Sequence, residues 1–160
     1  CGMEHLLGCN NHAMMMLAGD GVEANPTQAL TIYRDTCDRN DGKACVAMAI
    51  AWEQGKAGSM DPKKALGLYG RGCDLGALDG CYRGGALAVS GKAGAQDFVT
   101  AVGWWERACD QDHSSSCYAL GMLYQKGMGV RTSPDQASDL YEKACELGHR
   151  NACIKKQNMF

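Results

Sequence analysis

The sequence predicts an all-α protein that consists of a tandem array of helix pairs. Its ten cysteines form five C-x7-C pairs, and the first cysteines of successive pairs are always 36 residues apart. Turn-forming and helix-capping residues recur at fixed places within this period. Self-similarity at a period of this length is the signature of stacked repeats, in which no single unit buries its apolar side alone.

The first helix of each period should begin near the second cysteine of a pair and end at a glycine. A glycine at this place lets the chain leave the helix through a left-handed conformation. The glycines are Gly19, Gly55, Gly91 and Gly127. A row of small residues near the middle of this helix would allow another helix to approach closely: Ala13, Ala49, Gly85 and Gly121.

The second helix should start at a capping residue, which proline follows in three of four units. The caps are Asn25, Asp61, Asp97 and Ser133. Along this helix a small residue at position i is followed by a large aromatic residue at position i+4, which places both on one packed face. These pairs are Ala29 with Tyr33, Ala65 with Tyr69, Ala101 with Trp105, and Ala137 with Tyr141. Residues that tolerate a positive φ follow the helix: Asn40, Gly76, Asp112 and Gly148.

These signals define a single repeat domain over residues 1–160. Four full units are expected, at residues 9–44, 45–80, 81–116 and 117–152. Residues 1–8 then form the end of a preceding unit, and residues 153–160 form either the opening turn of a fifth unit or a short capping helix.

Composition restricts the class of partner and the compartment. The net charge of −2 and the lack of basic clusters argue against a nucleic-acid partner. No stretch has the roughly 20 apolar residues that a membrane-spanning helix needs. Ten cysteines favour an oxidising compartment. Because residue 1 is already part of the cysteine pattern, we expect a trimmed N-terminus from which any export signal has been removed.

The unit from Cys117 to Cys153 closely resembles a Sel1-like repeat, a relative of the tetratricopeptide repeat. The resemblance lies in L-G-x-x-Y from Leu120 to Tyr124, G-x-G-V from Gly127 to Val130, and A-x3-Y-x-K-A from Ala137 to Ala144. The regular C-x7-C pairs make the chain similar to the cysteine-rich secreted type, such as the Helicobacter cysteine-rich proteins. This resemblance implies a right-handed α/α superhelix with one disulfide per repeat junction, and a monomer.

Disulfides and metal ligation are the competing interpretations of the cysteines. A structural zinc site needs about four converging ligands, whereas a whole repeat separates successive pairs, so we expect neither metal nor cofactor. Lipid attachment at Cys1 is a further alternative. The period selects one pairing: Cys1 with Cys9, Cys37 with Cys45, Cys73 with Cys81, Cys109 with Cys117, and Cys145 with Cys153.

We expect the histidines and tryptophans to pack within the protein and not to bind a ligand. His5, His113 and His149 recur four residues after the first cysteine of a pair and are expected to pack in loops rather than to form a metal ladder. The segment His12–Met16 is expected to pack and not to bind copper(I). Trp52, Trp104 and Trp105 are expected in the core.

No serine, metal or other catalytic motif stands out, so the leading hypothesis is a periplasmic or secreted scaffold that binds a protein or peptide. The resemblance places the first helices on a concave face, with ligand-binding candidates Asn10, Met14, Val46, Ile50, Glu53, Tyr82, Tyr118, Met122 and Gln125. The alternative for each residue is packing against the opposite helices. The resemblance to the family implies two alternative functions, which are weak β-lactam binding or hydrolysis and immunity against a secreted toxin. It also implies one alternative location, the mitochondrial intermembrane space.

Overall fold

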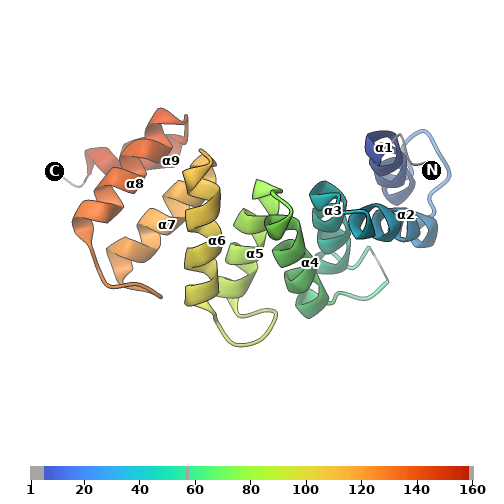
Figure 1. Cartoon of the computed structure of the whole chain (residues 1–160), viewed down its shortest axis with the longest axis horizontal. Helices are drawn as coiled ribbons and strands as arrows, with labels where there is room; N and C mark the ends of the chain where they lie inside the picture. The colour runs from blue at the N-terminus through green and yellow to red at the C-terminus, as the bar shows by residue number, and fades with distance from the viewer. Residues whose placement is uncertain (1–5, 57, 159–160) are drawn as a thin grey trace. The chain divides into compact units, whose positions relative to one another are not determined.

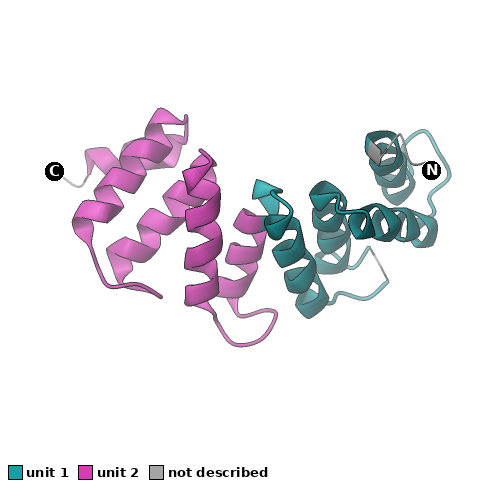
Figure 2. Ribbon diagram, in the orientation of Figure 1, with its two compact units in different colours: residues 1–80 teal, residues 81–160 magenta. Residues whose placement is uncertain are grey.

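The computed structural model describes residues 6–56 and 58–158, and of Leu6 only the backbone. This part of the chain contains nine helices and no strand (Figure 1). It divides into two compact units, residues 1–80 and residues 81–160 (Figure 2), and each is treated by itself. None of the described helices is both long and apolar enough to cross a bilayer.

The first unit contains two helix pairs. Its helices are α1 (Leu6–Ala18), α2 (Pro26–Asp38), α3 (Gly42–Glu53) and α4 (Pro62–Asp74). Within the unit, α1 packs against α2, α2 against α3, and α3 against α4. The core of this unit lies between α1, α2 and α3, and its buried side chains include Ala13, Met16, Ala29, Tyr33 and Ala44.

The second unit has the same alternation and ends in a short ninth helix. Its helices are α5 (Leu78–Ser90), whose first turn belongs to the first unit, α6 (Phe98–Asp110), α7 (Ser114–Lys126), α8 (Pro134–Glu146) and α9 (Arg150–Gln157). α7 packs between α6 and α8, and α9 packs on α8. One core cluster surrounds Trp105 and Leu120, and a second surrounds Tyr141 and Ala144.

The predicted caps start all four second helices. The side chain of Asn25 accepts a hydrogen bond from the backbone N–H of Gln28 at 3.0 Å, and Asp61, Asp97 and Ser133 do the same three residues ahead. These bonds satisfy N–H groups that lack a partner within the helix. Hydrogen bonds from Lys64 lower the pKa of Asp61, and those from Thr100 lower the pKa of Asp97.

The predicted turns are also confirmed. Gly127 ends α7 at φ 69° and ψ 35°, in the left-handed conformation, and Gly19, Gly55 and Gly91 have closely similar φ values. After the second helices, φ is also positive at Asn40, Gly76, Asp112 and Gly148. A strict period in the sequence therefore reflects a strict period in backbone conformation.

Small residues on the first helices make room for the aromatic residues of the second helices. A Cβ atom added to Gly85 would lie 2.7 Å from Cε2 of the Trp105 indole, and one added to Gly121 would lie 2.8 Å from Cε1 of Tyr141. Trp105 is 4% exposed, and its Nε1–H donates to the backbone carbonyl of Tyr82 at 3.0 Å. The core prediction is right for Trp105. Trp52 and Trp104 are only half-buried.

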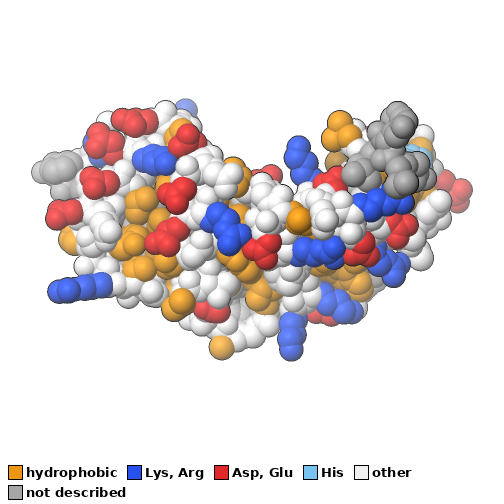
Figure 3. Space-filling model, in the orientation of Figure 1, with side chains coloured by type: hydrophobic (Ala, Val, Ile, Leu, Met, Phe, Trp, Pro, Cys, Tyr) orange, Lys and Arg blue, Asp and Glu red, His pale blue; other side chains and the backbone are white. Residues whose placement is uncertain are grey.

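Charged side chains of both signs lie on the exposed helix faces. On the face shown in Figure 3, Lys and Arg side chains are interspersed with Asp and Glu side chains. This pattern agrees with the small net charge of −2.

Candidate functional site

Disulfides join the end of a second helix to the start of the next first helix. The bonds Cys37–Cys45, Cys109–Cys117 and Cys145–Cys153 confirm the predicted pairing. Cys9, Cys73 and Cys81 are also disulfide-bonded, and no described cysteine is free. The predicted Cys1–Cys9 bond involves a residue outside the described part of the chain. Stapled joints of this kind are typical of proteins in an oxidising compartment.

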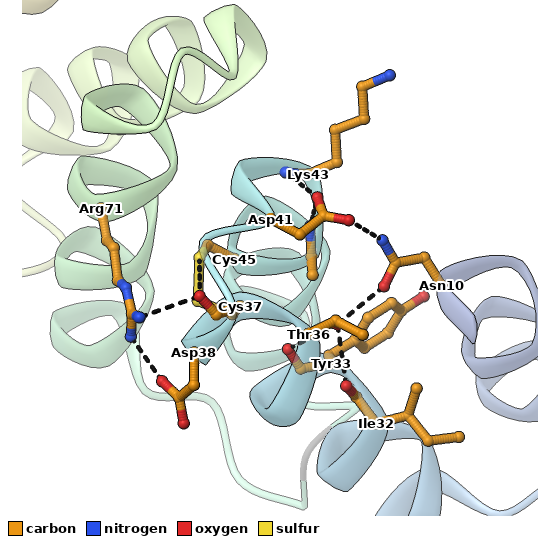
Figure 4. The surroundings of a disulfide bond; sticks show 11 residues. Asn10, Ile32, Tyr33, Thr36, Cys37, Asp38, Asp41, Lys43, Cys45 and Arg71 are labelled. Atoms are coloured by element: carbon orange, nitrogen blue, oxygen red, sulfur yellow. Dashed lines mark hydrogen bonds and ion pairs between the residues drawn. A yellow bond between two sulfur atoms is a disulfide. The ribbon is translucent and has the colours of Figure 1, made fainter. Parts of the chain in front are cut away.

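A cation from the following second helix braces two of these joints. In Figure 4, Arg71 points at the joint of Cys37 and Cys45, where Nη2 donates to the carbonyl of Cys37 at 3.0 Å and Nη1 pairs with Asp38 at 2.8 Å. Lys143 repeats the arrangement, because its Nζ donates to the carbonyl of Cys109 at 2.7 Å and pairs with Asp112 at 3.0 Å. Both cations satisfy a carbonyl at a helix C-terminus.

The predicted ligand-binding residues of the first unit differ in accessibility. Met14 is 59% exposed, whereas Val46 is 7% exposed and faces Gly72 and Gly80. Asn10, Ile50 and Glu53 are half-buried. Of these five candidates Met14 is therefore the most accessible and Val46 is buried, and ligand contact by any of the five stays a prediction.

Asn10 joins three elements of the first unit. Its Nδ2–H donates to the Asp41 carboxylate at 2.8 Å, and its Oδ1 accepts from the hydroxyl of Thr36 at 2.9 Å (Figure 4). Asp41 is the N-cap of α3, and Thr36 lies in the last turn of α2. The amide of Asn10 therefore ties α1 to the α2–α3 junction.

Two further candidates accept hydrogen bonds from buried tyrosines. Tyr69 donates its hydroxyl hydrogen to Glu53 Oε2 at 2.6 Å, and Tyr141 donates to Gln125 Oε1 at 3.0 Å. Both tyrosines are 0% exposed. A buried phenol needs a hydrogen-bond partner, and the last turn of the preceding first helix supplies it. The only side-chain oxygen of Gln125 is thus engaged, while its NH2 group donates no hydrogen bond to any described residue.

The second unit contains a pocket between α7 and α9. Its volume is about 290 Å³, and we call it the α7–α9 pocket. Two predicted residues, Tyr118 and Gln125, come together in it, while Tyr82 and Met122 are half-buried outside its lining. The complete lining is Tyr118, Gln125, Asn151, Ile154, Lys155 and Asn158.

Aromatic contacts hold Tyr118 in place at the pocket. Its ring stacks on His149 with centroids 4.4 Å apart and lies 5.6 Å from the ring of Tyr141. His149 caps α9 by accepting a hydrogen bond from the backbone N–H of Ala152 at 3.3 Å, and His113 caps α7 in the same way. The recurring histidines are therefore helix caps that also contact a tyrosine. His5 lies outside the described residues.

Tyr141 is expected to titrate well above the ordinary tyrosine value. Burial, with a contribution from Tyr118, raises its pKa to about 12. The raised pKa means that the fold favours the neutral phenol, so its stabilising contribution is complete below about pH 10, the ordinary tyrosine value, and is lost as the pH rises to about 12. Alkaline titration followed by tyrosinate absorbance should lose a step near pH 12 in Tyr141→Phe. Loss of an early step instead would contradict this environment.

The comparison with protein families finds the same repeat that the cysteine spacing predicts. The model of the Sel1 repeat family matches four segments of the chain, residues 6–41, 42–76, 80–113 and 114–149. The chain belongs to the Sel1 repeat family. Each Sel1 segment covers one pair of first and second helices, apart from the first two residues of α5, and all of α9 follows the last segment. No curated protein matches the chain.

Solved structures with the same fold include other Sel1 repeat proteins. A Sel1 repeat protein from Oxalobacter formigenes aligns with 94% of this chain at a TM-score of 0.82 and 22% identity, and the alignment covers 62% of that protein. The protective antigen c5321 of uropathogenic Escherichia coli aligns with 96% of this chain at a TM-score of 0.83 and 27% identity, over 33% of its own length. The present chain thus spans less than two thirds of either protein.

The Helicobacter pylori cysteine rich protein B aligns with 84% of this chain and 97% of its own length, at a TM-score of 0.63 and 26% identity. This match confirms the predicted resemblance to the cysteine-rich Sel1 proteins. Together with the helix pairs and the disulfides at their junctions, it establishes the predicted all-α solenoid fold.

Sequence reasoning missed the contribution of α9 to the pocket. The signal was present, because the 36-residue period places Ile154 in register with Tyr118 and Asn158 in register with Met122. Both Tyr118 and Met122 were candidates. Continuing the register beyond Cys153 would have added Ile154 and Asn158 to the predicted groove.

Proposed function

We propose that this Sel1 repeat protein is an extracytoplasmic scaffold that binds an extended segment of a partner protein on its first helices. The observation that supports this most is the α7–α9 pocket, which the first helix α7 and the helix in register with it, α9, line together. Interaction scaffolding is typical of stacked helical repeats, whose neighbouring units create extended binding surfaces.

The pocket lining matches the chemistry of a peptide. Gln125, Asn151 and Asn158 carry amides, which can donate to backbone carbonyls and, where an oxygen is available, accept from backbone N–H groups. Ile154 is 51% exposed and, with the ring of Tyr118, offers an apolar contact. A few convergent polar groups around an apolar patch are what a peptide side chain and its flanking backbone need.

The disulfides support a location outside the reducing cytosol. At least three buried or half-buried bonds hold the helix junctions. Bonds of this kind persist in the periplasm, in secreted proteins and in similar oxidising compartments. We therefore place the scaffold in the periplasm or outside the cell, with the mitochondrial intermembrane space as the alternative.

Substitution of Ile154 by aspartate should weaken peptide binding about tenfold or more, because it removes an apolar contact and introduces a charge that must be desolvated. The test uses a short peptide selected from a randomised library on the wild-type protein, and its Kd is measured by fluorescence anisotropy. Val99→Asp provides the matched control, since Val99 is a 71% exposed apolar residue on α6. Equal weakening by both substitutions would contradict binding at the pocket.

The two other functions from the family stay predictions. β-Lactam hydrolysis is tested by nitrocefin turnover, which should co-purify with the folded protein and disappear in Ile154→Asp if the pocket performs it. Immunity against a toxin is tested by asking whether this protein protects cells that produce a candidate toxin encoded by a neighbouring gene. A positive result in either assay, without peptide binding, would replace the scaffold proposal.

A further inference from the structure

We infer that the α7–α9 pocket selects peptide segments that carry an acidic side chain, and that Lys155 is the residue that recognises it. This inference rests on the proposed function, because it names the chemistry of the partner at the same pocket. It makes Lys155 a specificity-determining residue of the site.

Lys155 is the single charged residue of the lining. The other five lining residues are Tyr118, Gln125, Asn151, Ile154 and Asn158, so no carboxylate within the pocket neutralises the ammonium group. Lys155 is exposed, and its side chain has no hydrogen bond or ion pair with any described residue. Its neighbour Lys156 differs, because it is paired with Glu142 on α8. A carboxylate supplied by a ligand would complete the polar contacts of Lys155.

The two helices that form the pocket walls are exclusively basic. The sequence of α7 is SSSCYALGMLYQK and that of α9 is RNACIKKQ. Neither contains Asp or Glu, whereas together they carry Lys126, Arg150, Lys155 and Lys156. The chain as a whole has a net charge of −2. The pocket thus lies between two cationic elements of an otherwise slightly acidic protein, which favours an anionic group and disfavours a basic one.

The same residues define where the acidic side chain belongs in the bound segment. Ile154 and Lys155 are adjacent on α9, so the apolar contact of the pocket and its cation lie next to each other. A segment in which Asp or Glu stands close to an apolar residue fits this pair. The amides of Asn151 and Asn158 then remain for the peptide backbone.

The alternative role of Lys155 is purely structural. Lys155 and Lys156 both lie in the last turn of α9, where positive charge stabilises a helix through its macrodipole. In that role, removal of Lys156, which also has an ion pair, would destabilise α9 at least as much as removal of Lys155. A binding role separates the two lysines, because only Lys155 lines the pocket.

The experiment is a charge-swap selection with the full chain. Short peptides of randomised sequence, displayed on phage with both ends blocked by flanking linker residues, are selected in parallel on the wild type, Lys155→Glu, Lys126→Glu and Lys156→Gln. Lys126→Glu makes the same charge reversal on α7 outside the lining, and Lys156→Gln removes a charge from the last turn of α9. Circular dichroism and thermal unfolding show that each variant is folded, and Lys155→Gln is added in case the reversal unwinds α9.

We expect the wild type, Lys126→Glu and Lys156→Gln to enrich peptides with Asp or Glu next to an apolar residue, and Lys155→Glu to enrich Lys or Arg at that position. In a synthetic copy of a wild-type-selected peptide with acetylated and amidated ends, Glu→Gln should raise the Kd about tenfold, as expected for loss of a charge-assisted hydrogen bond.

Two results would overturn the inference while the scaffold function stands. These are enrichment without any acidic preference, and an equal change of preference in Lys126→Glu. Failure to enrich any peptide on any variant would remove the proposed function as well.

Discussion

Trp105→Ala is expected to lower the free energy of unfolding by about 3–5 kcal/mol, the cost usual for removing a buried tryptophan. The indole of Trp105 fills the space above Gly85 and donates to the backbone carbonyl of Tyr82. Alanine would leave both a cavity and a carbonyl without its partner. Urea unfolding followed by circular dichroism measures the change.

The adjacent Trp104 offers a control of the same residue type in the same helix. Because Trp104 is half-buried, its replacement by alanine should cost clearly less. Trp105→Phe should fall between the two, since it retains much of the packing but loses the hydrogen bond. A loss of stability in Trp104→Ala as large as in Trp105→Ala would contradict the described core.

Removing the disulfide between α6 and α7 by the paired substitution Cys109→Ala and Cys117→Ala is expected to cost about 2–3 kcal/mol, from the entropy of closing a loop of this length. The sulfur atoms of this joint are separated by eight positions in sequence and are buried. The unfolding midpoint in urea should fall accordingly, while the far-ultraviolet circular dichroism spectrum stays that of a helical protein.

Treatment of the wild type with a dithiol reductant gives an independent check. The fully reduced wild type should unfold at a lower urea concentration than the paired variant, because it loses the disulfides at the other joints as well as this one. A paired variant that unfolds at the same urea concentration as the wild type would show that helix packing alone holds the junction.

Most of the fold could be predicted from the sequence because the helix caps and turns depend on residues close together in the chain, and these residues recur in every unit. Asn25, Asp61, Asp97 and Ser133 act as caps through side chains that reach only three residues ahead. The positive φ angles at Gly127 and Asn40 likewise depend on one residue each. Pairing of the cysteines followed from their period. Interactions of this range can be inferred from spacing alone.

The site was less predictable because its contacts join residues far apart in sequence. Asn10 was a groove candidate, but its amide bonds to Asp41, 31 residues away. Glu53 and Gln125 were also candidates, and both accept hydrogen bonds from tyrosines 16 residues further on. A pattern shows that such a residue faces the neighbouring helix, but not whether a side chain of that helix or a ligand uses its polar atoms.

The braces at the helix junctions show how the length of the repeat is fixed. Arg71 reaches the carbonyl of Cys37, and Lys143 that of Cys109, in both cases across 34 residues. A deletion or insertion within a helix of this interval would rotate the residues beyond it, and would so move the cation away from the carbonyl it serves. Duplication or excision of a complete 36-residue unit keeps each cation, carbonyl and cysteine pair in register, so whole units are changes in size that this architecture tolerates.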